Sequence, residues 1–111
     1  MFILLGTITV TAGTPVDLFA NYTRLRGAGQ RVNSLYFQVG KDNQDDIYVG
    51  QQNLSIGSDT GIIAVLRPPT ANFLTELTME ITNQPNPYDL DSFRIDGGQS
   101  DDIVRVTAQV Y

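Results

Sequence analysis

Apolar and polar residues alternate along much of this chain, most regularly near its C-terminal end. From Val104 to Val110 every even position is Val or Ala, and every odd position between them is polar. Because successive side chains of a strand point to opposite faces, such a run can bury one face and wet the other. The pattern predicts a closing β-strand whose Val and Ala side chains face a core.

Similar segments recur upstream, separated by turn residues such as Gly, Pro, Asn and Asp. The segment around Leu74, Leu77 and Ile81 also fits helical spacing, but its alternation and β-branched residues favour a strand. The expected strands are residues 2–11, 16–20, 32–39, 46–50, 61–66, 73–82, 89–95 and 101–111. About eight short strands indicate an all-β fold, a single-domain antiparallel β-sandwich or jelly roll spanning residues 1–111.

The composition removes the residues that most often perform chemistry near neutral pH. The 111 residues include no Cys, His or Trp, which excludes disulfides, thiolate metal sites, and Ser-His or Cys-His catalysis. Paired carboxylates could in principle hydrolyse glycosides, but the Asp residues gather in polar turns, where Asp bonds nearby backbone amides. We therefore expect a protein that is not an enzyme, with no catalytic residue and no cofactor.

The acidic segment from Asp42 to Asp46 has one alternative interpretation, a calcium site built from oxygen ligands. It lacks the spacing, the central Gly and the closing Glu of an EF-hand loop. A structural turn without a metal is the preferred interpretation.

The net charge of −5 argues against sequence-independent binding to nucleic acid, which requires clustered Lys and Arg. No stretch approaches the roughly 20 apolar residues of a membrane helix, so no membrane partner is expected. The apolar start is broken at Gly6 and has no basic leader. We interpret it as a strand of a protein made in the cytoplasm.

Three of the seven basic residues, Arg24, Arg26 and Arg31, lie within eight positions around a Gly-containing loop. They can be a solvated loop that balances a negative surface. They can equally bind carboxylates of a partner, since guanidinium groups match carboxylates with two parallel hydrogen bonds.

Two expected strands carry apolar residues on both faces. Ile3 and Leu5 oppose the expected core face of the first strand, and Ile63 and Val65 oppose the core face of segment 61–66. A two-layer fold cannot easily bury both faces, so assembly or docking on a larger body would cover these four residues. We expect a homo-oligomer, with a trimer favoured.

Several segments together resemble short virion proteins of tailed bacteriophages. The resemblance rests on the opening Thr11–Val16 followed by Leu18, on Asn43 with Ile47–Gly50, on Gly61 with Leu66 and Pro68, and on the closing valine-rich strand. It implies a β-sandwich on the particle, often a capsid cement or decoration protein. The shared positions are turns and strands, so the resemblance assigns no binding residue.

The expected function is thus structural: a cement protein on the capsid surface of a virion, bound to the major capsid protein and stabilising the head shell. The alternatives are a head-tail connector, tail or fibre component, and, from another class, a carbohydrate-binding β-sandwich module. Such modules usually present aromatic platforms, and this chain has five Tyr, five Phe and no Trp.

Overall fold

Eight β-strands make up the regular structure in the computed structural model, which describes residues 2–18, 32–68, 76–80 and 93–110. For residues 2–5, 32–33, 76–80 and 110 the description covers the backbone. The strands are β1 (Phe2–Thr9), β2 (Val16–Asp17), β3 (Val32–Val39), β4 (Ile47–Ser55), β5 (Thr60–Leu66), β6 (Glu76–Glu80), β7 (Arg94–Gly97) and β8 (Ile103–Val110). The described residues contain no helix, and the all-β prediction is confirmed.

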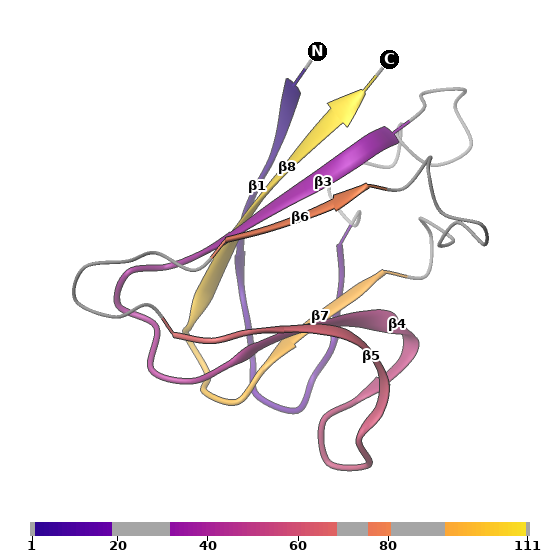
Figure 1. Cartoon of the computed structure of the whole chain (residues 1–111). Coiled ribbons are helices and arrows are strands. Elements are labelled where there is room, and N and C mark those ends of the chain that lie inside the picture. Colours follow the sequence, from indigo (N-terminus) through magenta and orange to yellow (C-terminus); the bar gives the residue numbers. More distant parts are fainter. Residues whose placement is uncertain (1, 19–31, 69–75, 81–92, 111) are drawn as a thin grey trace.

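The strands form two four-stranded antiparallel sheets, in the orders β1-β8-β3-β6 and β2-β7-β4-β5. Strand β1 pairs with β8, β2 with β7, β3 with β6 and β4 with β5, so the chain is one long antiparallel hairpin rolled onto itself. Figure 1 shows the two resulting layers, with β1 and β8 side by side at the two chain ends. This nested pairing is the strand order of a jelly roll, which selects between the two predicted all-β architectures.

The core lies between the sheets and is built from the alternating positions of β3, β4, β7 and β8. Leu35, Phe37 and Val39 of β3 are buried, as their alternation predicts. The prediction for the last strand is confirmed for Val104, Val106 and Ala108, which are completely buried. The other members of the core cluster are Val10, Leu18, Ile47, Val49, Leu66, Phe93 and Ile95.

One predicted face assignment on β5 is wrong. The register pairs Ile62 with Gly50 and Ala64 with Val49, so Ile63 is an extra residue in a β-bulge. A bulge places two residues against one and shifts the alternation beyond it. Ile63 therefore packs against the core together with Ala64, and does not share an outward face with Val65, which is 37% exposed.

A second bulge changes the register of β1. Ile3 lies opposite Ala108 and Leu4 opposite Thr107, but Gly6 lies opposite Val106, so Leu5 is the extra residue. Before the bulge, Ile3 and not Leu4 takes the register position opposite a buried residue of β8. Residues 2–10 therefore do not follow the single uninterrupted alternation that the sequence pattern predicts, because the bulge at Leu5 shifts it.

Several predicted boundaries also differ from the structure, among them those of β4 and β7. Strand β4 continues to Ser55 instead of ending at Gly50, and the hydroxyl of Thr60 donates a hydrogen bond to the carbonyl of Asn53 across that extension. Asp96 and Gly97, predicted as part of a turn, belong to β7. The turn begins at Gly98 because Asp96 and Gly97 still pair with Tyr48 and Ile47 of β4. The buried Asp96 carboxylate accepts the amides of Gly13 and Gly97.

Candidate functional site

The structure places the residues predicted to bind partners in different settings. Arg24, Arg26 and Arg31 lie outside the described residues, so their role stays a prediction. Ile3 and Leu5 are described by their backbone on β1, an outer strand of its sheet. Val65 lies exposed on β5 and Ile63 packs against the core, so these two are not neighbours on one surface.

The acidic turns, in contrast, come together at one end of the sandwich. Asp102, only 5% exposed, accepts hydrogen bonds from two backbone amides of the β3–β4 connection. The Gln44 amide donates to both carboxylate oxygens at 3.0 and 3.1 Å, and the Asp45 amide donates to Oδ2 at 2.9 Å. Carboxylates that accept hydrogen bonds from backbone amides form some of the stronger polar contacts in proteins. Asp102 thus joins the β7–β8 turn to the β3–β4 connection.

Asn43 joins the same two segments. Its side-chain Nδ2 donates to the carbonyl of Ile103 at 2.7 Å, and its Oδ1 accepts the amide of Ile103 at 2.9 Å. The side-chain amide therefore pairs with both backbone groups of Ile103, as a neighbouring strand would. Sequence reasoning missed this contact, because an Asn in a polar turn looks like any other turn residue.

The connection between β1 and β2 is held by two further side chains. Asp96 accepts the amide of Gly13 at 3.1 Å, and the hydroxyl of Ser100 accepts the amide of Ala12 at 3.0 Å. Three connections that are far apart in sequence are thus fixed to one another by side-chain-to-backbone hydrogen bonds. The prediction that the acidic segments are structural turns agrees with these contacts.

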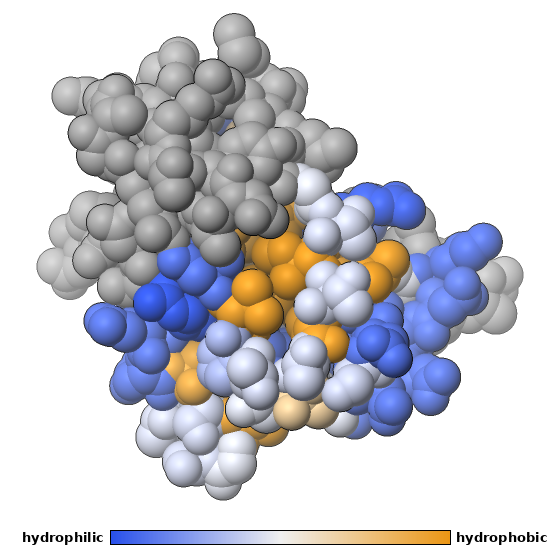
Figure 2. Space-filling model, turned by 180° about the vertical axis from the view of Figure 1, so that it is seen from behind, coloured by the Kyte–Doolittle hydropathy of each residue, from blue (hydrophilic) through white to orange (hydrophobic). Residues whose placement is uncertain are grey.

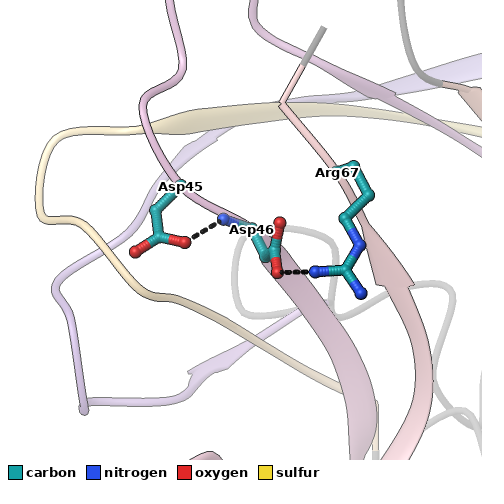
Figure 3. A network of polar contacts seen from close by, with 3 residues as sticks. All are labelled: Asp45, Asp46 and Arg67. Atoms are coloured by element: carbon teal, nitrogen blue, oxygen red, sulfur yellow. Dashed lines mark hydrogen bonds and ion pairs between the residues drawn. The ribbon is translucent and has the colours of Figure 1, made fainter.

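Figure 3 shows the acidic residues at the start of β4. Asp45 accepts the amide of Asp46 at 2.7 Å, and the Asp46 carboxylate pairs with the guanidinium of Arg67 at the end of β5. The Arg67 side chain is 75% exposed, so solvent screens this pair and its contribution to stability is small. The ion pair connects the residue before the start of β4 to the residue after the end of β5.

A hollow of about 410 Å³ lies beside these turns. It is formed where the end of β3 and the start of β8 meet the turns that adjoin them. Its lining residues are Gln38, Val39, Gly40, Lys41, Asp42, Asn43, Asp101, Asp102, Ile103 and Arg105. The hollow is large enough for a small ligand or a few side chains. Sequence reasoning did not find it, because its residues come from two segments about sixty positions apart.

The floor of the hollow depends on the absence of a side chain at Gly40. A Cβ atom there would lie 2.4 Å from Cγ1 of Ile103, a separation that packed atoms do not reach. Gly40 therefore allows Ile103 to lie across the strand end, while the amide of Gly40 donates to the Ile103 carbonyl at 3.0 Å.

Apolar surface is visible on the face opposite that of Figure 1. Figure 2 shows apolar residues gathered in the middle of this face, with hydrophilic residues on both sides.

The described part of the chain has neither a cluster of metal ligands nor a membrane-spanning helix. There, no three His, Cys, Asp or Glu side chains gather as ligands of one metal ion would. No helix among the described residues is long and apolar enough to cross a membrane.

No model of a known protein family matches the sequence, and no curated protein is significantly similar to it.

Proposed function

We propose that this protein is a structural component of a tailed-phage virion, a cement protein that binds major capsid subunits on the outer surface of the head and stabilises the shell. The observation that carries the proposal is the jelly-roll strand order, β1-β8-β3-β6 against β2-β7-β4-β5. Viral capsid and lectin domains repeatedly use this architecture. The step from fold to function is an analogy, supported by the resemblance of the turn and strand motifs to short phage virion proteins.

The use of the polar residues supports a binding protein over an enzyme. The carboxylates of Asp96 and Asp102 are buried and accept backbone amides from neighbouring turns. Groups committed to these contacts hold the scaffold rigid. A rigid scaffold loses little conformational freedom when it docks, which favours binding.

The test is co-sedimentation of the purified protein with expanded heads of the encoding phage that lack it. Saturable binding to heads supports the proposal. Binding to tails or connectors alone would instead favour the head-tail or tail assignment. Binding to members of a glycan panel, without binding to heads, would favour the carbohydrate-binding alternative and contradict the proposal.

The oligomeric state gives a separate prediction. Cement proteins are often found at local three-fold positions of icosahedral shells, and a trimer would cover apolar residues such as Val65, which is exposed in one chain. Light scattering at micromolar concentration should report about three times the chain mass of 12.2 kDa. A monomer both in solution and on the particle would contradict the trimer.

The arginine cluster gives another prediction. Replacement of Arg24, Arg26 and Arg31 together with Ala should weaken binding to heads and reduce its dependence on salt, because screening acts on exposed charges beyond about 8–10 Å at physiological ionic strength. The melting temperature should change little. Undiminished binding by the triple variant would show that the cluster is a solvated loop.

A further inference from the structure

We infer that the hollow between the end of β3 and the start of β8 is a recognition site for a short segment of a partner. This segment carries an acidic group at one end, a basic group at the other and aliphatic carbon between them. The inference deepens the proposed function, on which it rests, because the partner segment is assigned to the major capsid subunit. Its basis is the distribution of charge and apolar surface within the hollow.

The two ends of the hollow differ in charge. At the sheet end, Arg105 lies opposite Gln38 in the β3–β8 register, and their side chains are joined by one long contact of 3.5 Å. At the turn end lie Lys41, Asp42 and Asp101, all three exposed, with one net negative charge. The half-buried Ile103 supplies apolar surface between the two ends, whereas Val39 adjoins the hollow but is buried in the core.

These exposed charges are not used to hold the fold together. Among the described residues, ion pairs join Arg67 to Asp46 and Arg94 to Asp17, and neither pair involves the hollow. The carboxylates of Asp42 and Asp101 accept no hydrogen bond from the described residues, in contrast to that of Asp102. The charges at the rim are therefore available to a partner.

The size of the hollow limits what can occupy it. Its volume of about 410 Å³ is at the small end of the range for ligand sites, roughly 300–1,000 Å³. Asp101 and Arg105 are four residues apart, which places their Cα atoms at most ~13 Å apart in extended chain. Three residues of an extended partner segment cover about 7 Å between their outer Cα atoms, and long charged side chains at the two outer positions cover the rest. A carboxylate of the partner would bind Arg105, and an ammonium or guanidinium group would bind Asp42 and Asp101.

The walls of the hollow are fixed before binding. Asn43 pairs with both backbone groups of Ile103, and Asp102 binds the amides of Gln44 and Asp45. The walls therefore lose little conformational entropy when a segment binds. A small loss of this kind allows a small site to contribute measurable affinity.

The test uses two single substitutions with a matched control. Asp101→Asn and Arg105→Gln each remove one charge from one end of the hollow and should weaken binding to expanded heads about tenfold, the effect of about 1.4 kcal/mol. Asp59→Asn is the control, because Asp59, like Asp101, is an exposed Asp with positive φ, 55° against 74°, but lies in the β4–β5 turn. It should bind heads like the unmodified protein.

A second measurement works without heads. In a ¹⁵N NMR titration, a blocked peptide with one glutamate and one lysine separated by one alanine should shift the amides of residues 38–43 and 101–105. Asp101→Asn and Arg105→Gln should reduce these shifts, and Asp59→Asn should not.

The outcomes separate the two claims. If the unmodified protein binds heads and both hollow variants bind equally well, the inference about the hollow is wrong and the proposed function stands. If the protein fails to bind heads, the proposed function fails and the peptide titration decides whether the hollow recognises such a segment. Shifts confined to other residues, or no shifts, would overturn the inference.

Discussion

Replacing Val106 with Asp is expected to destabilise the protein by about 3 kcal/mol or more, a large part of the stability of a small protein. Val106 is completely buried on β8, between Gly6 of β1 and Phe37 of β3. A carboxylate at this position would lose its hydration among apolar side chains. Guanidinium denaturation followed by circular dichroism measures the loss, and a variant that remains unfolded in buffer satisfies the expectation.

Arg105→Asp is the matched control for this prediction. Arg105 is the adjacent residue of β8 and is exposed on the opposite face of the sheet. The same new carboxylate there should cost less than about 1 kcal/mol, because it stays in water. Equal midpoints for Val106→Asp and the unmodified protein would contradict the description of the core.

Replacing Asp102 with Ala is expected to cost about 2–4 kcal/mol, because it removes an acceptor that binds two backbone amides in a buried setting. The amides of Gln44 and Asp45 would lose the carboxylate that now accepts them at 2.9–3.1 Å. Hydrogen exchange should show these two amides losing protection first. Asp102→Asn keeps one carbonyl acceptor and should have an intermediate effect.

Asp42→Ala provides the comparison within the same acidic region. The Asp42 side chain is exposed and accepts no hydrogen bond from the described residues, so its removal should change the free energy of unfolding by less than about 0.5 kcal/mol. A loss of stability as large as that of Asp102→Ala would mean that net charge, and not the geometry of the turn, determines the effect.

The sequence pattern predicts the strands best where one face is buried without interruption. Strand β3 spans the predicted residues, and Leu35, Phe37 and Val39 face the core because period-two alternation leaves no other way to bury them. The same alternation predicts that Val104, Val106 and Ala108 of β8 face the core, and these side chains are buried. It also favours a strand over a helix for residues 76–80, which form β6.

The errors arise where tertiary contacts override that period. The bulges at Leu5 and Ile63 insert one residue each, and no composition rule distinguishes such an insertion from an apolar strand with two buried faces. Residues 51–55 follow the predicted strand 46–50, yet they continue β4, whose Ser55 pairs with Thr60 of β5.

The hollow was beyond prediction for a different reason. Its geometry depends on the approach of Ile103 to Gly40 and on the pairing of Asn43 with Ile103, two contacts between segments that alternation does not align. A glycine after a strand and an asparagine in a turn carry no signal of their distant partner. The pairing of β3 with β8 must be known before the site can be found.

The most direct test of the proposed function measures the stability of the particle and not binding alone. Expanded, DNA-filled heads that lack this protein should release their DNA on heating at a lower temperature than heads to which the purified protein has been added. Asp59→Asn should protect the heads as the unmodified protein does. Identical release temperatures with and without saturating protein would contradict a cement function.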